Sequence, residues 1–193
     1  MKLLRNRAVA IIITIVVAFS ATLMGVYRTA DKHTREIEAM FYDGVYRSDW
    51  GTRQPSAYSH LTNIANATLG IAVILEKYPE FTEIAEELLL IRRDFLATES
   101  IDEMLTLRIH MWHASRVFLS LIEEDAGIVT EKDINDIDHY VSTITGAYYA
   151  GDGGYSDKVE EYLEGRSAII SLLSLVFPIR SPEVCTYDGW VLL

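Results

Sequence analysis

The longest apolar stretch of the chain lies at residues 8–26 and contains no charged side chain. As a helix rising ~1.5 Å per residue it would cover about 28 Å, close to the hydrocarbon thickness of a bilayer. A single helix also satisfies its own backbone hydrogen bonds in hydrocarbon. Cationic and aromatic residues typical of membrane interfaces flank this stretch: Lys2, Arg5, Arg7, Tyr27 and Arg28. The pattern predicts a short basic N-terminus at 1–7 and a transmembrane helix at 8–27.

Two other interpretations of this stretch are open. A signal peptide has a basic start, an apolar centre of roughly 7–15 residues and small residues before its cleavage site, which residues 18–20 could provide. The apolar stretch continues past that point to Val26, which favours an uncleaved anchor. A buried core helix normally has a polar face, whereas this stretch offers only Thr14, Ser20 and Thr22.

Beyond the anchor, apolar residues recur at three- and four-residue intervals, the pattern of amphipathic helices. The predicted helices lie at 27–45, 55–78, 81–97, 101–124, 130–148 and 156–176. No segment alternates convincingly at period two, so we expect no strands, and short loops favour antiparallel neighbours. The chain is therefore predicted to be all-α, with one N-terminal transmembrane helix followed by an elongated antiparallel helical bundle of about four to five helices. The bundle domain is expected at 28–178 and a C-terminal tail at 179–193.

Local signals refine several of these helices. Pro55 suits the first turn of a helix, and Ser100 with Glu103 forms a capping box at the start of the fourth. Thr130 with Asp133 is a weaker version of the same cap. The fourth helix has these candidate core residues: Leu105, Ile109, Trp112, Val117, Phe118 and Leu121.

Charge separates the anchor from the rest of the chain. All 28 acidic residues follow residue 27, where 14 of the 17 Lys and Arg also lie, leaving a net charge of about −14 there. Such a surface repels nucleic acid, so no nucleic-acid partner is expected. Three cations lie on each side of the anchor, and the N-terminal amine together with Asp31 and Glu36 weakly favours an internal N-terminus and an external domain.

No catalytic or cofactor motif is evident. Cys185 is the only cysteine, which excludes a disulfide within the chain. His110 and His113 share a helix face, but a metal site needs three or four ligands, so they are weak metal candidates and ordinary surface histidines are expected. A calcium loop beginning at Asp133 would lack its glycine and its final glutamate, so a solvated helix face is predicted there.

Four tyrosines gather around the glycine-rich loop at 151–154: Tyr148, Tyr149, Tyr155 and Tyr162. They could line a ligand pocket. Large amphipathic side chains at a helix junction are more often packing residues, and we expect the four tyrosines to be packing residues.

Three segments of the chain resemble a known family, and one of them, FPIRSPEVC at 177–185, stands where LemA proteins have a short closing motif. EIEAMFYDGV at 36–45, with Phe41 and Gly44, looks like the segment after the anchor in divergent LemA proteins. YSDKVEEY at 155–162, with Tyr155, Val159 and Tyr162, is similar to the family's Y-N-x-x-V-x-x-[YF]-N. Both asparagines of that motif are replaced here, by Ser156 and Leu163. The resemblance implies a membrane-anchored, elongated helical bundle with no established enzymatic activity.

The predicted function is therefore a non-enzymatic scaffold or interaction module in the plasma membrane. Its expected partners are the bilayer, through residues 8–27, and a protein partner or further copies of the chain. The alternative is an extracytoplasmic sensor whose bundle binds a small ligand and passes a helix shift to a membrane partner.

Overall fold

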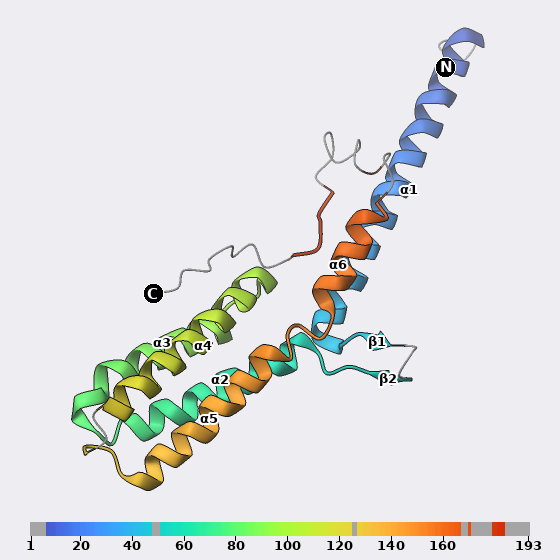
Figure 1. Ribbon diagram of the computed structural model, residues 1–193. Coiled ribbons are helices and arrows are strands. Elements are labelled where there is room, and N and C mark those ends of the chain that lie inside the picture. The colour runs from blue at the N-terminus through green and yellow to red at the C-terminus, as the bar shows by residue number, and fades with distance from the viewer. Residues whose placement is uncertain (1–6, 48–50, 125–126, 167–169, 171–178, 184–193) are drawn as a thin grey trace.

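The computed structural model describes residues 7–47, 51–124, 127–166, 170 and 179–183, and it shows an all-α architecture. Helix α1 (Arg7–Asp43) forms a straight rod, and four helices form a bundle that extends from its far end: α2 (Ala57–Leu75), α3 (Thr82–Ala97), α4 (Ile101–Glu124) and α5 (Glu131–Tyr149). Helix α6 (Tyr155–Glu164) leaves the bundle and runs back along α1 (Figure 1). The prediction of an all-α chain, in which a long apolar N-terminal helix is followed by a helical bundle, is confirmed.

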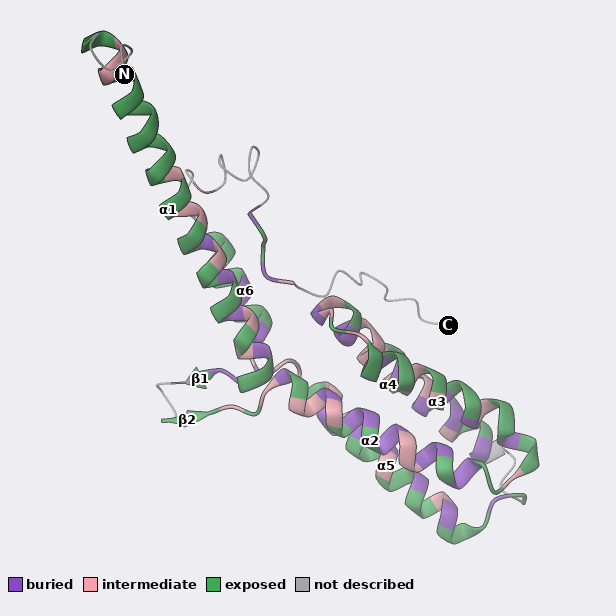
Figure 2. Ribbon diagram, turned by 180° about the vertical axis from the view of Figure 1, so that it is seen from behind, coloured by how far each residue is buried: buried purple, intermediate pink, exposed green. Residues whose placement is uncertain are grey.

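Helix α1 changes its surroundings along its length. Its N-terminal half exposes large apolar side chains on all sides, such as Ile12 and Phe19 (Figure 2), and it is long and apolar enough to cross a membrane. Its C-terminal half buries one stripe at spacings of four, three and four: Ala30, Thr34, Ile37 and Phe41. The apolar stretch and the first bundle-facing segment are thus one continuous helix.

The bundle is organised around α2, which contacts α3, α4 and α5. Its sequence is apolar on most sides, and ten of its residues are buried. Short connections make successive helices antiparallel, including the 3-10 turn η2 (Pro79–Phe81) between α2 and α3. Helices α2 and α5 approach each other closely at Gly70, where an added Cβ would lie 2.5 Å from the ring of Tyr140 on α5.

Several sequence predictions need correction. A small antiparallel ribbon, β1 (Tyr46–Arg47) with β2 (Thr52–Arg53), occupies the loop for which no strand was expected. The N-cap of α2 is Ser56, so Pro55 lies just outside that helix, and α2 ends at Leu75 rather than near 78. Helix α6 ends at Glu164 because Gly165 takes the C-cap position; the rest of the predicted 156–176 helix lies largely outside the described residues.

Two predicted core residues and one predicted surface residue are also misplaced. The predicted core residues Leu105 and Phe118 are buried, whereas Val117 and Leu121 are exposed. The buried face of α4 is completed by residues that were not predicted: Met104, Met111 and Ile122. Asp133 is buried although it was expected on a solvated face. Its carboxylate accepts hydrogen bonds from Lys77 Nζ at 2.8 Å and Tyr78 Oη at 2.5 Å, which hold the start of α5 to the turn that follows α2.

Candidate functional site at the junction of rod and bundle

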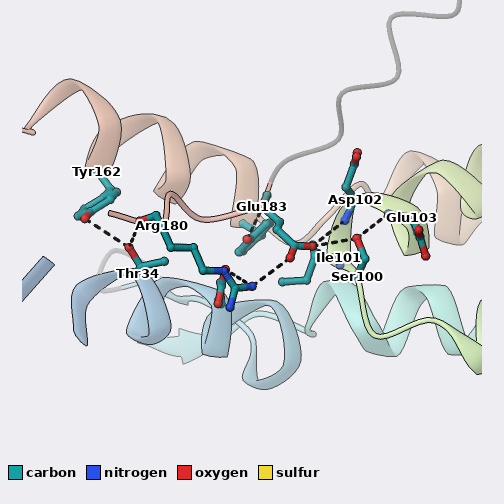
Figure 3. A network of polar contacts seen from close by, with 10 residues as sticks. Thr34, Ser100, Ile101, Asp102, Glu103, Tyr162, Arg180 and Glu183 are labelled. Atoms are coloured by element: carbon teal, nitrogen blue, oxygen red, sulfur yellow. Dashed lines mark hydrogen bonds and ion pairs between the residues drawn. The ribbon is translucent and has the colours of Figure 1, made fainter. Parts of the chain in front are cut away.

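A group of hydrogen bonds, ion pairs and aromatic contacts between distant segments lies where α1 meets the bundle. We call this region the junction. Three elements converge on it: the C-terminal half of α1, helix α6, and the segment 179–183, which we call the strap. Figure 3 shows the strap passing between α1 and α6 and reaching the start of α4.

Aromatic packing forms the base of the junction. The ring of Tyr155, at the start of α6, packs edge-on against Phe41 with the ring centroids 5.4 Å apart. Both side chains are fully buried. The Tyr155 hydroxyl donates to the carbonyl oxygen of Glu183 at 2.7 Å. Burial, reinforced by the nearby carboxylate of Glu38, raises the pKa of Tyr155, so this hydroxyl remains a donor throughout the physiological range.

Two glycines allow the backbones of the junction to approach each other. Gly44 ends α1 with φ +82°, and a Cβ there would lie 2.2 Å from the carbonyl oxygen of Gln54. Gly153 has φ +64°, and its Cβ would lie 2.5 Å from the carbonyl oxygen of Pro55. The short segment before α2 is thus held between the end of α1 and the loop that leads into α6. A side chain at either glycine would force these segments apart.

The strap is bonded both to α1 and to Arg166, just after the end of α6. Thr34 of α1 donates to the carbonyl oxygen of Arg180 at 3.0 Å, and the guanidinium of Arg180 pairs with Glu38 at 3.1 Å. From the α6 side, Arg166 Nη1 donates to Ser181 Oγ at 3.0 Å. The hydrogen bond from Thr34 links residues 146 positions apart in the sequence (Figure 3).

Glu183 carries the strap to the bundle. Its Oε2 atom accepts from Ile101 N at 2.7 Å, Ser100 Oγ at 3.0 Å and Asp102 N at 3.4 Å (Figure 3). The two backbone N–H groups belong to the first turn of α4, at the positive end of its dipole, where a carboxylate is favoured. Burial alone would raise the pKa of Glu183, but the hydrogen bonds from Ser100, Asp102 and Ile101 outweigh it and hold the pKa below its usual value.

The cap of α4 therefore differs from the predicted capping box. Ser100 Oγ accepts from Glu103 N at 3.3 Å, as expected. The Glu103 carboxylate, however, bonds to the hydroxyl of Thr98 rather than to the backbone of Ser100. Glu183 takes over the capping role from a distant part of the chain. At α5 the predicted cap is confirmed, since Thr130 Oγ1 accepts from Asp133 N at 3.2 Å.

The five residues that carry the LemA resemblance all lie at the junction. Phe41 and Tyr155 pack together, and Gly44 ends α1 directly below them. Val159 is buried against this cluster, and the hydroxyl of Tyr162 donates to the carbonyl oxygen of Ala30 at 3.4 Å. Comparison of the chain with protein-family models, curated proteins and solved structures found no match. Membership of the LemA family stays a prediction.

The other candidate residues are dispersed. His110 and His113 are exposed on α4, and no group of three or more His, Cys, Asp or Glu side chains able to hold a metal ion occurs among the described residues. The four tyrosines do not form one pocket, because Tyr155 and Tyr162 face α1 while Tyr148 stacks on Trp112 and Tyr149 is exposed. Arg7, Tyr27 and Arg28 flank the apolar part of α1; Lys2, Arg5 and Cys185 lie outside the described residues.

The sequence marked the strap only as part of 177–185, the segment similar to a closing motif of the LemA family, and did not indicate its contacts. Arg180 and Glu183 sit in a segment with no periodicity, and their partners come from helices more than 80 residues away. A second omission is Arg108, a charged residue on the apolar side of α4. That residue was detectable, because it lies three positions after Leu105 and three before Met111, in phase with the buried stripe.

Proposed function

We propose that the chain is a membrane-anchored, non-enzymatic scaffold or interaction module of LemA type, which holds its bundle at a set distance from the bilayer. The observation that carries this proposal is the continuity of α1. The same helix that exposes apolar side chains on all sides near its start is buried by α6 and the strap near its end. Asp43 lies 17 positions after Val26 in the same helix, so the end of α1 would stand about 25 Å beyond the end of the apolar stretch.

The orientation that we propose places the N-terminus inside the cell and the bundle outside, at the plasma membrane. The cations on the C-terminal side of the anchor support it, because two of them are paired within α1. Arg35 lies 3.0 Å from Asp31, and Lys32 lies 3.5 Å from Glu36. Reporter fusions at Met1 and Leu193 test it: a reporter active only outside the cell should work at Leu193 alone. Activity at Met1 alone would reverse the orientation.

Membrane anchoring itself has a direct test. Asp at both Ile13 and Val17 should release the full chain from membranes into the alkaline carbonate supernatant, because each acidic residue near the centre of a spanning helix costs about 2.5–3.5 kcal/mol. Ala at the same two positions should leave the chain in the membrane pellet. Release of the unmodified chain by carbonate would contradict an integral anchor.

A protein partner, or a second copy of the chain, is part of the same proposal. Large apolar side chains exposed on the bundle support it: Leu90 and Leu96 on α3, with Val117 and Leu121 on α4. Val117→Ser together with Leu121→Ser should reduce cross-linked adducts of the chain in membranes. Val73→Ser on α2, an equally exposed residue, is the control. Adducts unchanged in the α4 variant would place the contact elsewhere.

The second candidate is the extracytoplasmic small-ligand sensor. One observation favours it: Arg108 is a cationic side chain directed into the bundle without a counter-charge in the described part of the chain. The next subsection develops the chemistry of this position.

A further inference from the structure

Arg108 occupies an unusual position for an arginine. Its Nε and Nη1 atoms are buried in the bundle and donate no hydrogen bond to any described residue. A guanidinium stays charged in proteins, and a buried charge without a partner is costly. The chain contains 28 acidic residues, and six other Lys and Arg of the described part form ion pairs with them. No ion pair of Arg108 occurs among these described residues, so its charge is left for another partner.

The side chains around Arg108 are donors and aromatic rings. Its Cζ lies 5.4 Å from the centroid of Tyr148 on α5, and Trp112 stacks on the same ring at 4.3 Å with an interplanar angle of 6°. The indole Nε1 of Trp112 is also buried and without a hydrogen-bond acceptor among the described residues. Burial, and secondarily the positive charge of Arg108, lowers the pKa of His60 on α2.

We propose that Arg108 and Trp112 form a binding site for the oxyanion of a small molecule, a carboxylate or a phosphate. The guanidinium supplies the charge and charge-assisted hydrogen bonds, and the indole supplies a further donor. The Tyr148 and Trp112 rings form an apolar wall. The donors come from α4 and the wall from α4 and α5, inside the bundle, so the occupant is a small ligand rather than a macromolecule.

The site lies close to the junction. Tyr148 is in the last turn of α5, before the glycine loop that leads to α6. A ligand drawing α4 and α5 together would act on this loop, whose Gly153 packs against the segment before α2. This proposal rests on the sensor function and names the chemistry of its ligand.

Binding can be measured on the full chain in nanodiscs, with Trp50→Phe and Trp190→Phe so that Trp112 is the only indole. The probes are sodium phosphate, succinate and acetate, titrated at constant ionic strength. We expect saturable quenching or a shift of Trp112 emission with at least one probe, accompanied by a rise in Tm. A response to phosphate alone or to the carboxylates alone distinguishes the two ligand classes. The absence of saturation with all three probes overturns the proposal.

Matched arginine variants make the test specific. Arg108→Met should weaken binding about ten- to a hundredfold, because it removes a charged hydrogen-bond donor. Arg116→Met is the control, since Arg116 also lies over Trp112, at 5.7 Å, but from an exposed position. Without ligand, Arg108→Met should leave Tm unchanged or raise it; a lower Tm, or equal binding, identifies Arg108 as a structural residue and overturns the proposal. Carbonate extraction is independent of these results, so failure here would leave the anchored scaffold standing.

Discussion

Removing the Glu183 carboxylate should loosen the strap and the first turn of α4 together. Two substitutions separate its contributions. Glu183→Gln keeps an oxygen that can accept from Ile101 N but loses the negative charge at the helix N-terminus. Glu183→Ala loses both. Because Glu183 is the only side chain of the strap bonded to α4 among the described contacts, the effect should centre on this turn.

The magnitudes follow from the geometry. Charge at a helix N-terminus contributes ~0.3–1 kcal/mol when partly exposed, and the side chain of Glu183 is 30% exposed, so Glu183→Gln should cost about 1 kcal/mol. Glu183→Ala also loses a capping acceptor worth ~0.5–2 kcal/mol, for a total of about 2 kcal/mol. A loss of about 1.4 kcal/mol corresponds to tenfold faster opening of the protected amides.

Hydrogen exchange of the full chain in detergent micelles, read by mass spectrometry on peptides covering 98–104, measures this opening. Exchange should accelerate in the order unmodified chain, Glu183→Gln, Glu183→Ala. Glu160→Gln, an exposed glutamate on α6, is the control for a lost charge. Equal exchange at Ile101 and Asp102 in Glu183→Ala and the unmodified chain would refute the capping role.

The same contact has a pH dependence of known sign. Because the folded pKa of Glu183 is depressed, its contribution is present above the unfolded pKa of 4.5 and is lost as the pH falls through the lower folded value. Glu38 has a raised pKa, mainly from burial, so its protonation in acid relieves a destabilising charge and acts in the opposite direction. The exchange difference between Glu183→Gln and the unmodified chain should therefore shrink below about pH 4.5.

Three further predictions concern packing and charge elsewhere. Gly44→Ala should lower the free energy of unfolding, measured in urea, by about 1–3 kcal/mol, because its φ of +82° and the nearby Gln54 carbonyl oppose a Cβ. Gly51→Ala is the control: its φ is +63° but its surroundings are open, so it should cost less. Equal costs would contradict the close approach at Gly44. Gly70→Ala should lower Tm because its Cβ would meet the Tyr140 ring. Gly146→Ala has nothing within 4 Å and should raise the free energy of unfolding by about 0.5–1 kcal/mol. Stabilisation by both substitutions would show that the Tyr140 ring moves aside freely. Asp133 has its pKa lowered to about 2, first by the hydrogen bond from Lys77 and then by that from Tyr78. Its contribution to stability should be complete above the unfolded pKa of 3.8 and disappear as the pH falls through about 2, so acid unfolding curves of the unmodified chain and Asp133→Asn should converge in that range and stay apart above it.

The regular elements were predictable because they depend on neighbours in sequence. Ile137, Val141 and Ile144 mark the buried face of α5 by spacing alone, and all three are buried. Thr130 marks its start because a cap acts within three residues. On α4 the apolar pattern extends around much of the helix, so Val117 and Leu121 were assigned to the core although the partner helices cover a different side.

Contacts between distant segments were not predictable from one sequence. Asp133 reads as a surface residue because an isolated carboxylate favours water, and only the approach of Lys77 and Tyr78 makes its burial favourable. The same applies to Glu183, whose three donors belong to the start of a helix 80 residues earlier. The contact between Phe41 and Tyr155 was partly predictable. Both residues belong to segments that resemble the LemA family, but the resemblance did not predict that their rings pack together.

The unbroken α1 fixes the azimuth of the bundle as well as its height. Each residue of an α-helix turns the chain by about 100° and advances it ~1.5 Å, so one alanine inserted after Arg28 would swing the buried stripe, and everything packed on it, by that angle about the membrane normal. Seven inserted residues would restore the facing to within ~20° while raising the bundle by about 10 Å. A series of such insertions would separate two requirements on any partner in the same membrane: a partner bound sideways would respond to the angle, and one bound at a fixed height would respond to the length.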